Sequence, residues 1–363
     1  MAERLRWTTI VPLVALLTTV VTWGSHPHGV AVAAVGVLLI AAVLAAVHHA
    51  EIVAHQVGEP FGSLLLAVAV TVIEVGLIVT LMVSGGSGTE ALARDTVFSA
   101  VMICVNGIAG LSLLVSALRH ELAVFNSEGA GAALATVITL ASLCLVLPSF
   151  TTSHPGPEFS GVQLAFAAIA SLVVYVVFVF TQTVRHRDFF LPVDRQGNTR
   201  DLDGDDHADP PGGRAAMMSG LLLVAALVAV VGLAKVSSYA IEDGVASLGF
   251  PKAVVGVIIA LLVLLPESIA AVRQAAGERV QISLNLAYGS AMASIGLTIP
   301  AIAVASIWLD GPLVLGLDPT QMVLLAISVV VGILTVVPGR SKVLQGALHL
   351  VMMAAFVFLS ISP

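Results

Sequence analysis

The sequence predicts an all-α polytopic membrane protein with about eleven transmembrane helices. Of the 363 residues, 58% are hydrophobic and only 10% are charged, and the mean hydropathy is +1.05. A soluble domain carries about 25% charged residues, so this composition excludes a soluble globular enzyme. The apolar runs are long and continuous, whereas a membrane β-barrel alternates polar and apolar residues in short segments. We therefore expect the chain to cross a lipid bilayer as helices.

Eleven apolar stretches approach the roughly 20 residues that a helix needs to cross about 30 Å of hydrocarbon. The first stretch is short, but no small-residue cleavage site follows it, so we expect it to be retained rather than removed as a signal peptide. In chain order, the expected spans are Thr8–Trp23, Val30–Val47, Gly62–Val83, Thr96–Leu118, Ala132–Leu147, Val162–Val184, Ala215–Ala234, Ala253–Val272, Ile282–Leu309, Gln321–Val337 and Val343–Ile361.

The basic residues orient these spans. With the N-terminus inside, twelve of the fifteen Lys and Arg residues fall in inner loops, and only Arg94, Lys235 and Lys252 fall in outer loops. This distribution obeys the rule that cytoplasmic loops carry an excess of positive charge. We expect a protein of the bacterial cytoplasmic (inner) membrane with its N-terminus inside and its C-terminus outside.

The longest polar stretch divides the chain into two halves. Residues 185–214 are acidic at their centre and rich in Gly and Pro. Asp201–Asp209 has the D-x-D-G-D spacing of a calcium loop, but no Glu stands at the twelfth position of an EF-hand, which favours a solvated cytoplasmic linker. The expected organisation is an extra helix in 1–29, a five-helix repeat in 30–184, the linker in 185–214 and a second five-helix repeat in 215–363.

This organisation predicts an inverted-topology repeat. Because five is an odd number, the second half enters the membrane in the opposite orientation from the first. Inverted repeats place substrate sites near the bilayer midplane, at corresponding positions of the two halves.

Two acidic residues lie deep inside apolar spans. They are Glu74 and Glu267, each in the second span of its half, with no Lys or Arg inside the spans to pair with either. Burying a charge at the bilayer centre costs about 2.5–3.5 kcal/mol even on a permissive scale. We interpret the pair as a cation site, and a structural pair of protonated carboxyl groups is the alternative.

Neutral polar residues surround the two glutamates in the sequence. Pro266 directly precedes Glu267 and predicts a helix break there, because proline lacks an amide hydrogen. The small residues of the ninth span fit either close helix packing or an ion site. The expected supporting oxygens come from Thr71, Asn106, Asn285, Ser290 and Ser294.

The chemistry of this set points to transport. Calcium prefers oxygen ligands, and a carboxylate must lose its proton to bind a metal. The same two carboxylates can therefore carry either Ca²⁺ or H⁺, which is the logic of proton–cation antiport by alternating access. A passive channel, a structural protein with a locked glutamate pair and an intramembrane protease are the alternatives, and the two mirrored halves favour a carrier.

The sequence argues against several other functions. It contains no ATP-binding G-x-x-x-x-G-K-[ST] motif and no H-E-x-x-H zinc motif. We therefore expect no enzyme activity and no bound cofactor, with Ca²⁺ and H⁺ as substrates and the bilayer as partner. The net charge of −7 disfavours nucleic-acid binding. Cys104 and Cys144 lie inside apolar runs, which argues against a disulfide framework.

A polar cluster follows the second span. It consists of His48, His49, Glu51, His55 and Glu59, at the expected cytoplasmic end. Histidine titrates near neutral pH, so this cluster fits metal recruitment or pH sensing along a cytoplasmic approach. A plain interfacial cap of the helix is the alternative.

Several stretches resemble the cation/calcium exchanger superfamily, and more closely its ChaA-type calcium/proton antiporters. They include HHAEIVAHQVGEPFGSLLLAVAVTVIEVGLI, FTQTVRHRDFFLP, LLVLLPESIAAVRQA, QISLNLAYGSAMASIGLTIPA and GRSKVLQGALHL, spread over nearly the whole chain. The resemblance implies one extra helix plus two five-helix bundles, with Glu74 and Glu267 binding the cation and exchanging protons. Many superfamily members have Gly-Asn before each glutamate, where this chain has Val70-Thr71 and Val263-Leu264. Exchange of Na⁺ or K⁺ for H⁺ on the same scaffold therefore stands beside Ca²⁺ exchange.

Overall fold

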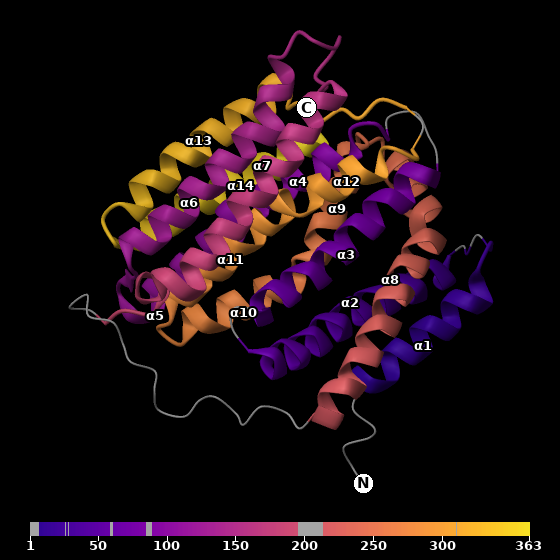
Figure 1. Ribbon diagram of the computed structural model, residues 1–363, viewed down its shortest axis with the longest axis horizontal. Helices are drawn as coiled ribbons and strands as arrows, with labels where there is room; N and C mark the ends of the chain where they lie inside the picture. Colours follow the sequence, from indigo (N-terminus) through magenta and orange to yellow (C-terminus); the bar gives the residue numbers. More distant parts are fainter. Residues whose placement is uncertain are drawn as a thin grey trace.

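The structure is a computed structural model that describes residues 7–25, 27, 29–58, 61–84, 89–194, 213–309 and 311–363, except the side chains of Ser63, Ser84 and residues 213–215. Most of the predicted linker, including Asp201–Asp209, and the predicted approach residue Glu59 lie outside these residues. Within them the chain forms a bundle of helices (Figure 1).

The described residues of the first half form seven α-helices and several short π and 3₁₀ turns. Its α-helices are α1 (Trp7–Thr22), α2 (Val30–Val57), α3 (Phe61–Ser84), α4 (Leu92–Met102), α5 (Ala109–His120), α6 (Ser127–Ala141) and α7 (Gly161–Phe180). Its short turns are η2 (Ile103–Ile108), η3 (Ser142–Val146), η4 (Leu147–Ser149), η5 (Thr181–Arg185) and η6 (Arg187–Phe190). The π turn η2 joins α4 to α5, so that one bilayer span is made of three helical segments.

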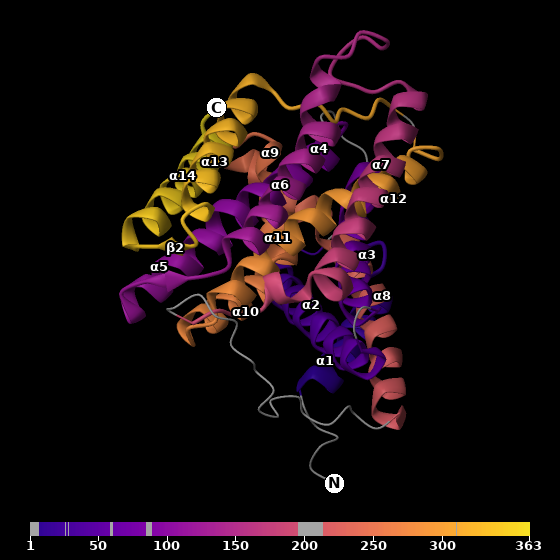
Figure 2. The same cartoon turned by 60° about the vertical axis from the view of Figure 1, so that its left-hand side comes forward.

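Seven further helices lie in the described part of the second half. They are α8 (Gly213–Ser247), α9 (Ala253–Val263), α10 (Leu265–Ala276), α11 (Val280–Gly296), α12 (Thr298–Ala305), α13 (Pro319–Val336) and α14 (Val343–Ile361). A short antiparallel pair links the halves: β1 (Ala123–Val124) bonds β2 (Arg340–Ser341), with Ala123 opposite Ser341. Helix α11 runs through the middle of the bundle in both Figure 1 and Figure 2, and most of its side chains are buried.

The helices agree with the predicted spans. In the described part of the chain, nine helical segments are long and apolar enough to cross a membrane, and α9 with α10 forms a tenth span bent by 54°. The predicted first span corresponds to α1, which is shorter. The bend confirms the expected effect of Pro266, which has no amide hydrogen for the carbonyl of Leu262.

Two helices extend beyond the predicted spans. Helix α2 continues from Val47 to Val57, and α8 continues from Ala234 to Ser247. The extensions contain good helix formers such as Ala, Glu and Gln but fewer apolar residues. Hydropathy therefore marked the part of each helix suited to hydrocarbon and missed its ends.

The loops gather at two ends of the bundle. At one end, His120 Nε2 lies 3.2 Å from the Ala276 carbonyl oxygen, and the β1–β2 pair holds residues 123–124 against 340–341. At the other end, the Val314 amide donates to the Glu90 carbonyl at 3.1 Å. We call these the inner end and the outer end, after the sides to which the sequence assigned their loops. Which end faces the cytoplasm stays a prediction.

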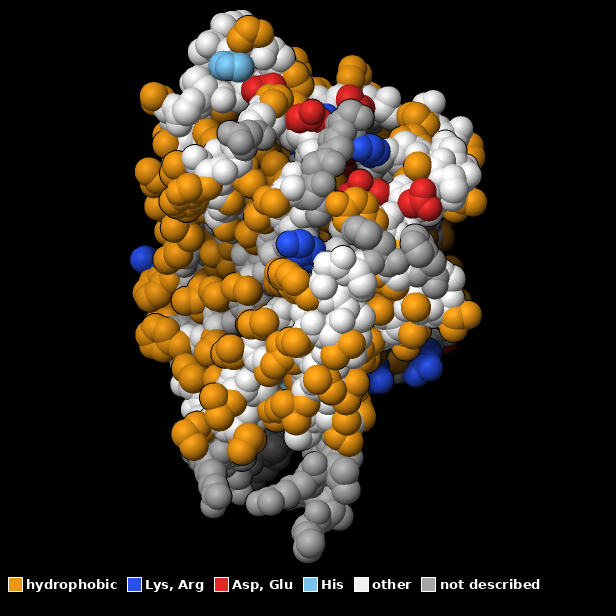
Figure 3. All heavy atoms as spheres, turned by 90° about the vertical axis from the view of Figure 1, so that its right-hand side faces the viewer, with side chains coloured by type: hydrophobic (Ala, Val, Ile, Leu, Met, Phe, Trp, Pro, Cys, Tyr) orange, Lys and Arg blue, Asp and Glu red, His pale blue; other side chains and the backbone are white. Residues whose placement is uncertain are grey.

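The surface and the interior are both apolar. Hydrophobic side chains spread over much of the face in Figure 3, and acidic side chains gather toward its upper part. Inside, a larger hydrophobic cluster is centred on α4–α7 and α11–α14, and a smaller one on α1, α2 and α8. Helix α3 contributes Ile78 to the larger cluster and Ile73 and Leu77 to the smaller. Glu74 therefore lies on a helix that packs against both hydrophobic clusters.

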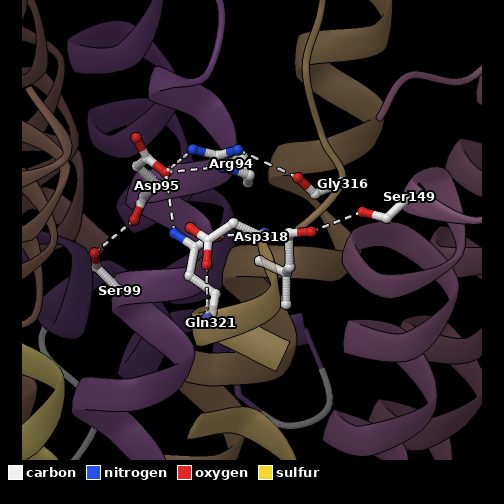
Figure 4. A network of polar contacts seen from close by, with 8 residues as sticks. Arg94, Asp95, Ser99, Ser149, Gly316, Asp318 and Gln321 are labelled. Atoms are coloured by element: carbon white, nitrogen blue, oxygen red, sulfur yellow. Dashed lines mark hydrogen bonds and ion pairs between the residues drawn. The ribbon is translucent and has the colours of Figure 1, made fainter. Parts of the chain in front are cut away.

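A polar network ties the two halves together at the outer end (Figure 4). Arg94 Nε and Nη2 each lie 2.8 Å from Asp95 Oδ1, and Arg94 Nη1 donates to the Gly316 carbonyl at 3.3 Å. Gln321 Nε2 also donates to Asp95 Oδ1, at 3.4 Å. The outer-end network comprises Arg94, Asp95, Ser99, Ser149, Gly316, Leu317, Asp318 and Gln321. Asp95 is a third buried carboxylate within a membrane-spanning segment, and unlike the two glutamates it has a basic partner.

We expect Asp95→Asn to destabilise the protein by about 2 kcal/mol, because a charge-assisted bond to a nearly buried arginine is lost. The measurement is the apparent melting temperature of purified protein in detergent. Asp318→Asn is the matched control. Asp318 caps α13 by accepting from the Gln321 amide, and asparagine caps a helix as well as aspartate does. Equal melting temperatures for the two variants would contradict this role of Asp95.

Candidate cation site

Glu74 lies near the middle of α3 and is 2% exposed. Its Oε2 accepts hydrogen bonds from Ser294 Oγ at 3.1 Å and Thr298 Oγ1 at 3.0 Å. Its Oε1 is buried and has no hydrogen-bond partner among the described residues. The two hydroxyl groups hold one carboxylate oxygen in place, which leaves the other for a ligand.

A break between α11 and α12 positions the two hydroxyl groups. Pro300 lacks the amide hydrogen that would bond the Gly296 carbonyl, so the helix is interrupted at Leu297. Ser294 lies just before the break and Thr298 just after it, four residues apart. Tyr175 of α7 packs against Gly296, where a Cβ would approach the Tyr175 Cβ to 2.7 Å. The break and this close packing place both hydroxyl groups against α3.

Glu267 lies in the first turn of α10, directly after the bend at Leu264, and is 5% exposed. Its buried Oε2 has no hydrogen-bond partner in the described part of the chain. The first turn of a helix has unpaired amide groups and a positive dipole end, which favour a carboxylate. Its charge also interacts with that of Glu74. The helix break therefore serves to place the second carboxylate near the first.

One cavity of about 270 Å³ brings the two glutamates together. It is lined by α3, by α7 with η5, and by α10 and α11. Of the predicted supporting residues it contains Thr71, Asn285, Ser290 and Ser294. The full lining is Leu66, Ala67, Val70, Thr71, Glu74, Tyr175, Phe178, Val179, Gln182, Glu267, Ile282, Asn285, Leu286, Gly289, Ser290, Ala293 and Ser294.

The cavity extends toward the inner end. Leu66 lies in the second turn of α3, Ile282 in the first turn of α11 and Gln182 in η5 after α7, all toward the inner end. The deepest lining residues are Glu74 and Ser294, near the middle of the bundle. Among the described residues, none from the outer-end loops lines this cavity. The site is therefore approached from the inner end in this conformation.

Two of the predicted supporting residues are engaged elsewhere. Asn285 lines the cavity, but its amide donates to the Phe190 carbonyl at 2.6 Å and its Oδ1 accepts from Gln281 at 2.9 Å. Asn106 does not line the cavity: its amide donates to Ser328 Oγ at 2.9 Å. The expectation that Asn106 supplies an oxygen to the site is corrected by this placement, because its side chain points to α13 and α14 instead.

The described members of the predicted approach cluster, His48, His49, Glu51 and His55, lie on helix α2. His49 is 3% exposed, and its Nε2 lies 2.9 Å from the carbonyl of Thr8. Pro12 cannot donate to that carbonyl, so His49 takes the place of the missing amide and joins α2 to α1.

The other described members of the cluster do not share a centre. His48 packs its ring against that of His49, with ring centroids 5.5 Å apart. Glu51 interacts electrostatically with His55 and with Glu267. In the described part of the chain, no three His, Cys, Asp or Glu side chains gather in a way that could hold a metal ion. Metal recruitment by this cluster is therefore not supported by its geometry, whereas Glu51 stays a candidate for the approach.

Sequence reasoning missed Thr298 and Gln182. Thr298 bonds Glu74 directly and Gln182 lines the cavity. The spacing of Ser294 and Thr298, one helical turn apart and followed by Pro300, was a usable signal for the first. Gln182 lies in the π turn η5, for which the sequence had no signal.

A bundle of membrane-spanning helices that encloses two carboxylates in a cavity reached from one end defines a class, the membrane carriers of cations. The chain belongs to the sodium/calcium exchanger protein family, which it matches over residues 28–184 and 218–362. The predicted membership of the cation/calcium exchanger superfamily is thereby confirmed.

Individual proteins share this similarity. "Putative ionic transporter y4hA" of Sinorhizobium fredii (strain NBRC 101917 / NGR234) is 48% identical over 90% of this chain and 87% of its own length. The sodium-potassium/proton antiporter ChaA of Escherichia coli (strain K12) is 32% identical over 96% of this chain and 94% of its own. The structure of native YfkE superimposes with a TM-score of 0.72 at 17% identity, covering 98% of this chain and 100% of that one. The last match shows that the fold is shared.

Proposed function

We propose that the protein is a proton-coupled cation antiporter that exports Ca²⁺ from the cytoplasm in exchange for H⁺. The observation that carries this proposal is the pair Glu74 and Glu267 in one cavity. Each has a buried carboxylate oxygen without a hydrogen-bond partner in the described residues. A buried acceptor without a partner costs about 1–3 kcal/mol. A proton or a cation bound there would remove that cost.

The donor set suits a hard cation. Ca²⁺ takes six to eight oxygen ligands, which include carboxylates, neutral oxygens and water. The two carboxylates balance its charge in a medium of low dielectric constant, and the hydroxyl groups of Thr71, Ser290 and Ser294 lie in the same cavity. Carboxylates that bind a metal must be deprotonated. Loading a cation therefore releases protons, and protonation releases the cation.

The direction of the cavity fits export. If the inner end faces the cytoplasm, as the basic residues predict, the cavity is open to the side from which a cation is loaded. Transport then requires a second conformation in which Glu74 and Glu267 face the outer end.

A Na⁺(K⁺)/H⁺ antiporter on the same scaffold is the second candidate. Two observations favour it. The relative ChaA of E. coli is named a sodium-potassium/proton antiporter. Moreover, neither Asn106 nor Asn285 offers a free carboxamide oxygen to the site, so the donor set has fewer strong ligands than Ca²⁺ ordinarily takes.

A cation panel separates the two candidates. Purified protein is reconstituted into proteoliposomes that contain a pH-sensitive dye, and Ca²⁺, Na⁺, K⁺ or Mg²⁺ is added in turn. We expect Ca²⁺ to drive proton movement in the opposite direction, and Mg²⁺ to be ineffective because it gives up its water ligands reluctantly. Proton movement with Na⁺ or K⁺ alone would select the second candidate. Cation flux without proton movement would refute antiport altogether.

A further inference from the structure

A buried polar network joins the π turn η2 to α13 and α14 and does not line the cavity. His349 of α14 is fully buried. Its Nδ1 lies 3.1 Å from Asn106 Oδ1, and its Nε2 lies 3.2 Å from Thr335 Oγ1. Because the Asn106 oxygen only accepts, Nδ1 carries the proton, and Nε2 accepts from the Thr335 hydroxyl. We call Asn106, Ser328, Thr335 and His349 the His349 network.

The network holds a π turn. Asn106 lies in η2, where the Ala109 amide bonds the Cys104 carbonyl five residues back. The Asn106 amide donates to Ser328 Oγ, which in turn donates to the Leu324 carbonyl at 2.7 Å. A π turn is less favourable than continuous α-helix and is frequent at functional sites. Side-chain bonds from α13 and α14 therefore stabilise a backbone form that would otherwise relax.

Close helix packing fixes the histidine. Helices α5 and α14 cross at Gly110 and Gly346. A Cβ on Gly110 would lie 2.6 Å from the His349 Cβ, and a Cβ on Gly346 would lie 2.6 Å from the Leu114 amide nitrogen. Both glycines are therefore required for the two helices to approach this closely. The imidazole has little room to take another rotamer, so it holds Asn106 in one place.

The same turn also contacts α10 and α11, two of the helices that line the cavity. Cys104, which lies in this turn, is fully buried. Turn η2 packs on α10, which carries Glu267, and on α11, which carries Ser294. It also packs on α13 and α14, which carry Ser328, Thr335 and His349. The turn is thus the piece of backbone between the His349 network and the glutamates.

We propose that Asn106 and His349 are positioning residues for cation exchange. They hold the π turn η2 in place, and this turn packs on α10, the helix that carries Glu267. The inference rests on the proposed function, since it assigns these residues to the same site. It predicts that a defect in the His349 network loosens the packing of turn η2 around Cys104 and weakens cation binding, although no network residue touches the cation.

The alkylation rate of Cys104 is a measurement that a purely structural role of the network would leave unchanged. With Cys144→Ser, Cys104 is the one thiol left in the 363-residue sequence, and its alkylation by N-ethylmaleimide reports the packing of the turn. We expect His349→Leu to raise the alkylation rate and the KM for the cation about tenfold each, the change that loss of one buried hydrogen bond supports. His349→Gln should restore part of both values, since its amide can bond Asn106.

Thr335→Val provides a milder variant if His349→Leu fails to fold. It removes the partner of Nε2 without changing side-chain shape. Thr136→Val is its matched control, because the Thr136 hydroxyl bonds Ala132 in its own helix. Native alkylation and native KM in folded Thr335→Val protein would overturn the proposal. Alkylation does not require transport, so it still tests the positioning role if the wild-type protein moves no protons.

Discussion

We expect the replacement of Glu74 or Glu267 by Gln to abolish cation-driven proton movement in proteoliposomes. Glutamine keeps the size of the side chain but has neither the charge to bind a cation nor a proton to exchange. We expect the transport rate to fall at least about 100-fold in each single variant, equivalent to about 2.8 kcal/mol. The two effects should not add in the double variant, because the carboxylates act on one ion as a unit.

Asp95→Asn is the matched control for these variants. It removes the charge of another buried carboxylate, but Asp95 belongs to the outer-end network and does not line the cavity. We expect it to lower the melting temperature and to retain transport below that temperature. Folded, inserted Glu74→Gln or Glu267→Gln protein with native transport would refute the role of the glutamates. Loss of transport in all three variants would instead indicate a general sensitivity to buried charge.

We expect Gly289→Leu to block transport by filling the cavity. Gly289 lies in α11 between the two glutamates and the inner end, and it lines the cavity. A Cβ built on it would meet no atom of the described residues within 4 Å. A leucine side chain there would project into the cavity, which is the path that we propose for the cation. We expect the maximal transport rate to fall more than about tenfold, while the melting temperature stays near that of the wild type because no packed atom has to move.

Two controls accompany this variant. Gly289→Ala adds one methyl group to the same position and should keep most of the transport, with a small gain in stability because alanine favours a helix over glycine by about 1 kcal/mol. Gly220→Leu makes the same large change in α8, where a Cβ also meets no described atom within 4 Å and where no cavity wall is involved. Native transport by Gly289→Leu would show that the cation takes another path to Glu74.

The sequence was a reliable guide to whatever depends on composition along the chain. Hydropathy located the eleven apolar segments, and Pro266 located the bend of the eighth. The scarcity of charge singled out Glu74 and Glu267 because a carboxylate in hydrocarbon is costly wherever it lies. The positions of both glutamates in one cavity agree with the expectation that inverted halves bring corresponding residues together.

The neighbours of the glutamates were less predictable. Asn106 and Ser294 are equally good candidates for cation ligands in the sequence, since both are polar residues in the third span of a half. In the structure, Ser294 bonds Glu74, whereas Asn106 turns away and bonds Ser328 and His349. His49 is likewise of a residue type that often binds metals. In the structure its Nε2 lies instead against the Thr8 carbonyl, for which Pro12 has no amide hydrogen.

The sequence by itself thus determined that the protein is a helical membrane protein, where its spans lie, and that Glu74 and Glu267 are buried, although it did not single out the buried Asp95. Only the tertiary structure decided that Thr298 and Ser294 hold Glu74 from residues more than 200 positions away, and that the cavity extends to the inner end. The physical reason is that lipid tails and protein interior are equally apolar. A membrane helix is hydrophobic all round, so its sequence does not show which face meets lipid and which meets another helix. That choice is made by packing between helices.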